Sequence, residues 1–120
     1  MFPFLRRGPG RLTPRQARQR TSGGEAVLLD VRETPEWQAG HAPDALHLPL
    51  SRLMAGAPLP AGARDRPVVT ICRSGNRSRQ AAKLLAGRDV DATDVSGGMT
   101  AWARQGLPVI GGGGSSGVIA

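Results

Sequence analysis

The strongest constraint on the fold is a buried-strand pattern that ends at the chain's only cysteine. Residues 68–71 are all β-branched, which is typical of a short strand buried on both faces. After Cys72 and a short loop, residues 78–85 repeat small and apolar side chains at helical spacing. The sequence therefore predicts a strand, a loop and a helix in succession, with Cys72 at the junction of strand and loop.

The predicted position of Cys72 indicates a reactive thiolate. The first N–H groups of a helix lack partners within the helix and carry the positive end of its dipole, so they stabilise an anion. Gly75 allows the loop to curl around the sulfur, and Arg73 and Arg77 add positive charge. A buried structural cysteine is the alternative interpretation. Electropositive surroundings are typical of reactive cysteines, and we therefore interpret Cys72 as a nucleophile.

Three motifs in this chain carry a family resemblance. Residues 72–78, Cys-Arg-Ser-Gly-Asn-Arg-Ser, resemble the active-site loop of rhodanese-type sulfurtransferases. Residues 29–41 and 95–102 resemble the first and the C-terminal signatures of the same family, and all three occur in the expected order. The alternation of short strands with helices also predicts an α/β fold. We expect a single rhodanese-like domain, with a central, mainly parallel sheet flanked by helices on both faces.

The resemblance also implies the residues of the site. Cys72 is the expected catalytic residue, and the expected substrate-binding residues are Arg73, Ser74, Gly75, Asn76, Arg77 and Ser78. Asp30 and Arg32 are expected to support the loop, although a purely local role for Asp30 at the end of a strand is an equal alternative. We expect structural roles for His41 and His47, and we expect no metal and no other cofactor.

The reaction implied by the resemblance is sulfur transfer by double displacement through a Cys72 persulfide. The expected donor is a small sulfur-containing anion such as thiosulfate, or another persulfide. The expected acceptor is cyanide in an assay, or a thiol, a thioredoxin-like protein or a sulfur-carrier protein. Four residues separate Cys72 from Arg77, whereas the related phosphatases and arsenate reductases have a longer loop, so those activities rank behind. A non-catalytic docking or sulfur-relay module is the other alternative.

Length and charge predict one domain with two flexible ends. A chain of 120 residues is long enough for one core and too short for two. We assign residues 1–11 to a basic arm, residues 12–110 to the rhodanese-like domain and residues 111–120 to a Gly/Ser-rich tail. The first twenty residues carry six arginines and no acid, so most of the net charge of +7 belongs to this end. The rest is nearly neutral, and nucleic acid is not an expected partner.

Cysteine usage and hydropathy predict a cytoplasmic protein. A single cysteine cannot form an intrachain disulfide, which favours a reducing compartment. No apolar run approaches the ~18 residues of a membrane span, and none fits the apolar region of a secretory signal. The composition, rich in Arg, Ala, Gly and Pro, indicates a GC-rich bacterial source.

The remaining elements are predicted from periodicity and capping. Thr-Pro pairs at 13–14 and 34–35 predict helix starts, because Thr caps a helix and Pro suits its first turn. His41 is expected to open a strand. The other expected elements are helices at 49–54 and 99–104, strands at 26–31, 45–48 and 92–95, and a loop at 56–67.

Overall fold

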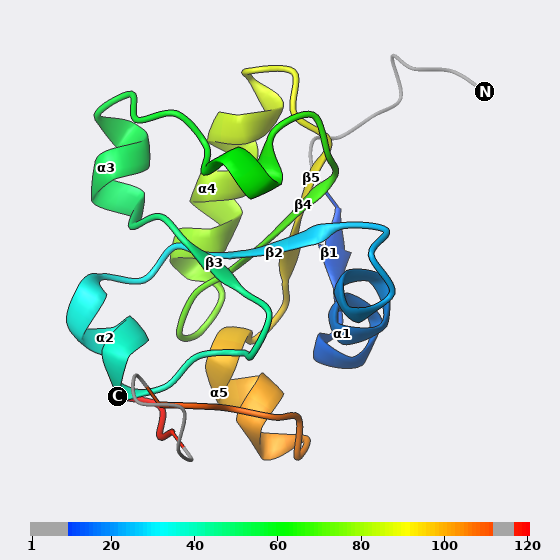
Figure 1. Cartoon of the computed structure of the whole chain (residues 1–120), viewed down its shortest axis with the longest axis vertical. Helices are drawn as coiled ribbons and strands as arrows, with labels where there is room; N and C mark the ends of the chain where they lie inside the picture. The colour runs from blue at the N-terminus through cyan, green and yellow to red at the C-terminus, as the bar shows by residue number, and fades with distance from the viewer. Residues whose placement is uncertain (1–9, 112–116) are drawn as a thin grey trace.

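The computed structural model describes residues 10–111 and 117–120. Strands and helices alternate along the chain (Figure 1). In order, the elements are β1 (Arg11–Leu12), α1 (Pro14–Ser22), β2 (Val27–Asp30), α2 (Thr34–Ala39), β3 (Leu46–His47), α3 (Leu50–Met54), a 3-10 helix η2 (Ala61–Ala63), β4 (Val68–Ile71), α4 (Asn76–Ala86), β5 (Ala92–Val95) and α5 (Gly98–Arg104).

In the described residues, five strands form one sheet in the order β1-β5-β4-β2-β3, and every neighbouring pair is parallel. The central strand β4 and its neighbour β2 are buried at every position. Because all strands run in the same direction, the segments that follow β2, β4 and β5 all leave the sheet at the carboxyl ends of the strands. This is the end of the sheet at which α/β proteins place their binding sites.

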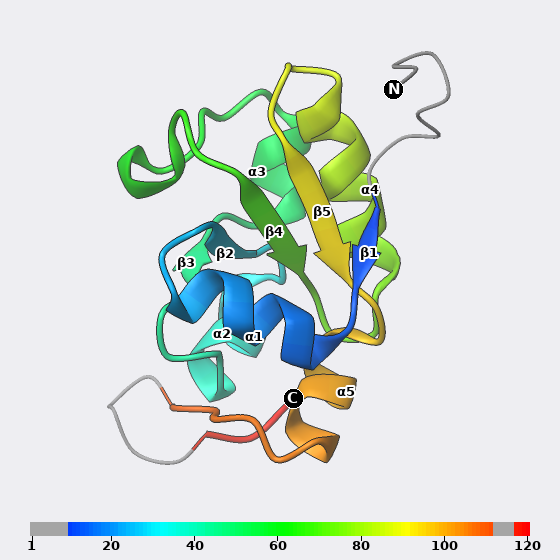
Figure 2. The same cartoon turned by 90° about the vertical axis from the view of Figure 1, so that its right-hand side faces the viewer.

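Helices cover both faces of the sheet. Buried side chains of α1 and α5 pack in one cluster around Trp102, while those of α3 and α4 pack in a second cluster on the opposite face. Figure 2 shows α1 in front of the sheet and α3 and α4 behind it. The expected α/β fold class is therefore confirmed. No helix in residues 10–111 and 117–120 has the length and apolar character needed to cross a bilayer.

The capping signals explain where two helices begin. Thr13 is the N-cap of α1: its hydroxyl accepts the N–H of Gln16 at 3.2 Å, and the Gln16 side chain accepts the N–H of Thr13 at 2.9 Å. The second predicted start is shifted by one residue, because Glu33 and not Thr34 is the N-cap of α2. The Glu36 carboxylate accepts the N–H of Glu33 at 3.1 Å, which fixes the first turn.

The structure changes the predicted boundaries at both ends of the domain. Arg11, which we assigned to the flexible arm, lies in β1 and pairs with β5. Residues 1–9 lie outside the described residues. Of the predicted flexible tail, residues 112–116 also lie outside them, but residues 117–120 return to the domain, where the N–H of Val118 donates to Ala39 O at 3.0 Å. His41 was expected to begin a strand, but it forms only an isolated antiparallel bridge with Ile110. The next strand, β3, begins at Leu46.

Candidate active site

The loop between β4 and α4 surrounds the sulfur of Cys72. Cys72 follows the last residue of β4 and is 1% exposed. Gly75 adopts the left-handed conformation, with φ 109°, and its N–H donates to Cys72 Sγ at 3.1 Å. As predicted, the loop curls around the sulfur with Gly75 at the turn. An N–H aimed at the sulfur stabilises negative charge on it.

The start of α5 holds the same loop from the other side. The N–H of Met99 donates to Cys72 O at 2.7 Å, and the N–H of Thr100 donates to Arg73 O at 2.9 Å. These helix N–H groups have no partner within α5, and the loop carbonyls satisfy them. Gly98, with φ 58°, allows this approach because a Cβ at this position would lie only 2.6 Å from Arg73 O. Helix α5 therefore fixes the backbone that presents Cys72.

A chain of polar contacts leads from the sulfur to β1. Cys72 Sγ lies 3.5 Å from Ser78 Oγ, and the Ser78 hydroxyl donates to Asp94 Oδ2 at 3.0 Å. Arg11 donates twice to the Asp94 carboxylate, at 3.0 and 3.1 Å, and once to Gly75 O at 3.1 Å. Ser78 was a predicted site residue, whereas Asp94 and Arg11 were missed. The one indication of this contact in the sequence was an acidic residue, Asp94, near the end of the predicted strand 92–95.

The last arginine of the loop is paired with an acid on α2. Arg77 donates two hydrogen bonds to the Glu36 carboxylate, at 2.6 and 2.8 Å. These bonds lower the pKa of Glu36 below its ordinary value of 4.5, against the opposing effect of burial. The same pairing raises the pKa of Arg77. Sequence analysis assigned Arg77 to the site but did not identify Glu36. Of the other predicted binding residues, Arg73, Ser74 and Asn76 are exposed.

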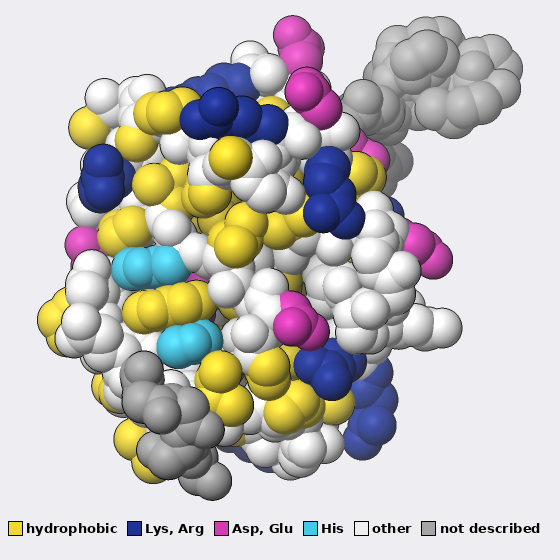
Figure 3. Space-filling model, viewed as in Figure 1, with side chains coloured by type: hydrophobic (Ala, Val, Ile, Leu, Met, Phe, Trp, Pro, Cys, Tyr) yellow, Lys and Arg dark blue, Asp and Glu magenta, His cyan; other side chains and the backbone are white. Residues whose placement is uncertain are grey.

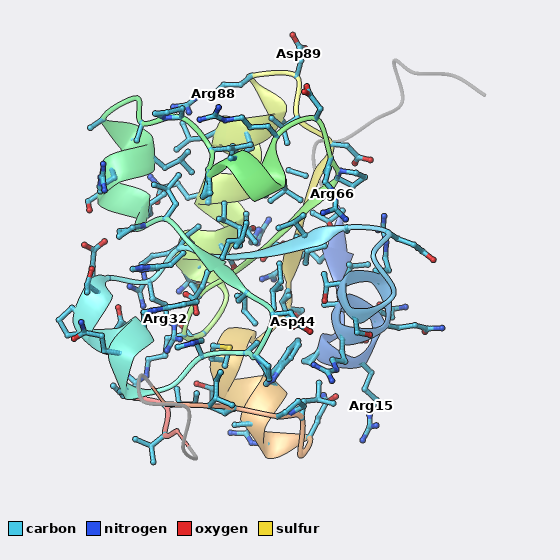
Figure 4. All side chains as sticks on the ribbon, viewed as in Figure 1. Arg15, Arg32, Asp44, Arg66, Arg88 and Asp89 are labelled. Carbon is cyan, nitrogen blue, oxygen red and sulfur yellow. The ribbon has the colours of Figure 1, made fainter. Side chains whose placement is uncertain are left out.

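Asp30, the last residue of β2, and Arg32, in the segment that leads to α2, form a buried ion pair. Both side chains are fully buried, and Arg32 donates to the Asp30 carboxylate at 2.7 to 3.1 Å and to Gly40 O at 2.6 Å. Arg32 lies beside α2 in Figure 4. Within the described residues, no hydrogen bond joins either side chain to residues 72–77. The pair therefore shapes the backbone next to the loop. It reaches the loop by charge and not by a hydrogen bond, because Asp30 is among the groups that raise the pKa of Arg77, after the larger effect of Glu36.

Both histidines brace α2 through an aromatic stack. The ring of Trp37 lies between those of His41 and His47, with centroids 3.6 and 4.8 Å away and nearly parallel planes. Figure 3 shows the two cyan histidines on either side of a yellow side chain. His41 Nδ1 donates to Trp37 O at 2.8 Å, and His47 Nε2 donates to Arg32 O at 2.7 Å. The stack fixes the helix that carries Glu36.

Together, the fold and the loop define an α/β protein whose single cysteine lies at the carboxyl end of a parallel sheet, with a loop N–H directed at its sulfur. Residues 13–105 match the family model described as "Rhodanese-like domain". The match covers well over half of the chain, and the chain belongs to this family.

Solved structures show the same fold. A rhodanese-related protein from Thermoplasma volcanium is 27% identical, with a TM-score of 0.73, and the alignment covers 84% of this chain and 97% of that one. A rhodanese-like domain protein from Staphylococcus aureus is 24% identical over 78% of this chain and 90% of that one, with a TM-score of 0.67. A protein from Rhodopseudomonas palustris, named as a possible tyrosine phosphatase, is 24% identical over 84% of both chains, with a TM-score of 0.71.

Proposed function

We propose that this protein is a sulfurtransferase that carries a sulfane sulfur as a persulfide on Cys72. The observation that carries the proposal is the N–H of Gly75 at 3.1 Å from Cys72 Sγ, inside a loop with four residues between Cys72 and Arg77. A short loop of this kind suits one additional sulfur better than a tetrahedral phosphate or arsenate. Family membership supports the same class of reaction.

The first half-reaction loads the sulfur. The Cys72 thiolate attacks the outer sulfur of thiosulfate, a new S–S bond forms, and the S–S bond of the donor breaks. Sulfite leaves with the electron pair, and Cys72 carries the persulfide. Positive charge from Arg73 and N–H groups of the loop stabilise the anions on both sides of this step. A persulfide donor reacts in the same way and leaves as a thiolate.

The second half-reaction unloads the sulfur. A thiolate or cyanide attacks the outer sulfur of the persulfide, and the electron pair of the broken bond returns to Cys72 Sγ. Because both partners are anions, little proton movement is needed and the mechanism requires no dedicated general base. A thiol, a thioredoxin-like protein or a sulfur-carrier protein in the cytoplasm is the physiological acceptor in this proposal. The single cysteine supports it, because the chain contains no second thiol to resolve the persulfide.

Intact-mass spectrometry tests the proposal directly. The wild-type protein and a Cys72→Ser variant are incubated with thiosulfate and measured before and after cyanide is added. We expect an adduct of about 32 mass units, one sulfur atom, on the wild type alone, and its removal by cyanide. An adduct on neither protein would overturn the proposal.

Two further measurements separate the alternative functions. Hydrolysis of p-nitrophenyl phosphate or reduction of arsenate, without an adduct from thiosulfate, would make the protein an oxyanion enzyme. Persulfide formation with very slow turnover on small donors, together with tight binding to a protein partner, would make it a sulfur-relay module. We expect turnover with thiosulfate and cyanide and no phosphatase activity.

A further inference from the structure

Arg11 on β1 reaches the catalytic loop from the edge of the sheet. It lies opposite Asp94 in the pairing of β1 with β5. Its Nε and Nη2 donate to the two oxygens of Asp94 at 3.1 and 3.0 Å, and Nη2 also donates to Gly75 O at 3.1 Å. The arginine precedes residues 13–105, the part of the chain that matches the family model, so the family match does not account for its role.

Gly75 leaves room for this guanidinium. A Cβ at position 75 would lie 2.9 Å from Arg11 Nη2 and 3.1 Å from the backbone N of Gly97. The N–H of the same glycine donates to Cys72 Sγ at 3.1 Å. Because Arg11 holds the carbonyl of Gly75, it restrains the residue whose N–H faces the sulfur.

Asp94 places a negative charge close to the sulfur. Its side chain is 2% exposed, and one hydroxyl stands between it and Cys72. Ser78 Oγ lies 3.5 Å from Cys72 Sγ and 3.0 Å from Asp94 Oδ2. A carboxylate this close disfavours a thiolate by repulsion of like charges, which is strong where water is excluded. It also draws the Ser78 proton away from the sulfur.

Arg11 opposes both effects of the carboxylate. Its charge neutralises Asp94, which weakens the repulsion between the two anions. Its Nη2 and the Ser78 hydroxyl donate to the same oxygen, Asp94 Oδ2. The carboxylate therefore keeps a hydrogen-bond donor when the Ser78 proton turns to the sulfur, and the turn costs less.

We propose that Arg11 is a positioning residue that favours the thiolate form of Cys72, through the charge of Asp94 and the backbone of Gly75. The inference deepens the proposed sulfurtransferase function and rests on it, because the thiolate is the form that attacks the sulfur donor. Arg11 itself does not contact the sulfur, and its effect passes through the two residues that it holds.

The pH dependence of Cys72 alkylation by iodoacetamide tests the proposal. Rates are measured by mass spectrometry across the range in which thiols ionise. The site described above holds further charged groups that stay unchanged in every variant: the Arg77–Glu36 pair of α4 and α2, the Asp30–Arg32 pair after β2, and the exposed Arg73 of the loop. A difference between the profiles therefore reports the substituted residues.

The expected shifts have opposite signs. Arg11→Gln leaves the carboxylate without its counter-charge, so the profile should move to higher pH and the rate at neutral pH should fall about tenfold. Asp94→Asn removes the repelling charge and should move the profile to lower pH. The double variant lacks both charges and should return most of the way to the wild-type profile. A purely structural role of the pair would not produce this reversal.

Two further variants act as controls. Arg15→Gln removes an exposed arginine of α1 that points away from the domain in Figure 4, and it should keep the wild-type profile. Arg11→Lys keeps the charge but lacks the planar fork that holds Asp94 and Gly75 together, so its profile should lie between those of the wild type and Arg11→Gln. Circular dichroism confirms that each variant is folded. Shifts of Arg11→Gln and Asp94→Asn in the same direction, or no shift in either, would overturn the proposal.

Sulfur loading separates failure of this inference from failure of the proposed function. The wild type and Arg11→Gln are incubated with thiosulfate at neutral pH, and we expect Arg11→Gln to form the persulfide about tenfold more slowly, in step with its alkylation. The expected alkylation shifts without persulfide formation on the wild type would support the role of Arg11 and overturn the proposed function. Persulfide formation on the wild type with an unshifted alkylation profile of Arg11→Gln would overturn the role of Arg11 and leave the proposed function standing.

Discussion

Arg77 and Glu36 lie 41 positions apart in the chain, yet their side chains are joined by hydrogen bonds of 2.6 and 2.8 Å. The pair ties α4, which begins in the loop after Cys72, to α2, which follows strand β2. Arg77 is therefore oriented by a carboxylate and partly neutralised by it before any substrate anion arrives. Glu36 is in this sense a positioning residue for the loop.

Replacing Glu36 by Gln is expected to lower the free energy of unfolding by about 1 kcal/mol near neutral pH, since the pair is only partly buried. The folded-state pKa of Glu36 is lowered, so its stabilising contribution is present above the unfolded pKa and is lost as pH falls through the folded one. The difference between wild type and variant should therefore shrink as pH falls below 4.5. Urea unfolding at neutral pH and at about pH 3 measures it.

Glu25→Gln is a suitable control, because Glu25 is an exposed glutamate whose ion pair with arginine is long: Glu25 Oε2 lies 3.9 Å from Arg20 Nε. We expect this variant to match the wild type closely at both pH values. A difference between wild type and Glu36→Gln that stayed constant or grew under acidic conditions would show that Glu36 acts by packing and not by its charge.

The parts of this site that local sequence could predict are those made by neighbouring residues. The β-branched run before Cys72, the small-residue face after it and the left-handed Gly75 all act within a few positions, and the structure contains each of them. The first predicted helix cap, Thr13, is also a local interaction and was confirmed. Short-range patterns report backbone geometry directly, which is why this part of the prediction succeeded.

The parts that could not be predicted are contacts across long stretches of chain. Asp94 meets Arg11 because β1 joins the edge of the sheet beside β5, and it meets Ser78 because α4 packs against β5. Nothing in a charged N-terminal stretch indicates a two-residue strand. The return of the C-terminal segment to Ala39 depends in the same way on tertiary contacts. A single sequence shows that such residues are charged or small, but not which partners they meet.

The contact between Ser78 and Cys72 predicts an effect on thiol reactivity. The Ser78 hydroxyl donates to Asp94, and rotation of its proton lets it donate to a Cys72 thiolate at 3.5 Å instead. Ser78→Ala removes this donor. We expect iodoacetamide to modify Cys72 about fivefold more slowly at neutral pH, which corresponds to a weakened charge-assisted hydrogen bond. The rate is measured by mass spectrometry.

Ser96→Ala is the matched control for this experiment. Ser96 is exposed in the turn before α5, and its substitution is expected to leave the alkylation rate unchanged. Equal rates for the wild type and Ser78→Ala would mean that the N–H of Gly75 and the helix dipole, without the hydroxyl, account for the reactivity of Cys72.

Removing Asp30 is expected to destabilise the whole domain. Asp30→Ala would leave the fully buried guanidinium of Arg32 without its partner carboxylate, and an uncompensated buried charge costs about 3 to 5 kcal/mol. Within the described residues, Arg32 Nη1 has no hydrogen-bond partner even in the wild type. Asp44→Ala, at an exposed position, should change the free energy of unfolding by less than about 0.5 kcal/mol. Urea titrations measure the free energy of unfolding of both variants. Similar losses in the two would contradict the stabilising role of the Asp30–Arg32 ion pair.

Gly98 and Gly106 together separate backbone strain from loop distortion. Both adopt positive φ values, 58° and 76°, so Ala at either position meets the same kind of strain, about 1 to 2 kcal/mol. A Cβ at Gly106 has no heavy atom within 4 Å, whereas a Cβ at Gly98 meets the backbone oxygens of Cys72 and Arg73. Gly106→Ala should therefore be destabilised only by the backbone strain and should form the persulfide at the wild-type rate.

Gly98→Ala must in addition push the catalytic loop away from α5 and break the bond from Met99 N–H to Cys72 O. We expect it to lose about 3 kcal/mol or more of unfolding free energy. Persulfide formation should fall by more than about tenfold, since even small misplacement of a nucleophile is costly. Urea unfolding and the mass assay with thiosulfate measure both quantities, and circular dichroism at low temperature confirms that the variant is folded. If the two variants behaved alike in both assays, α5 would not be what positions Cys72, and the loop would be rigid on its own.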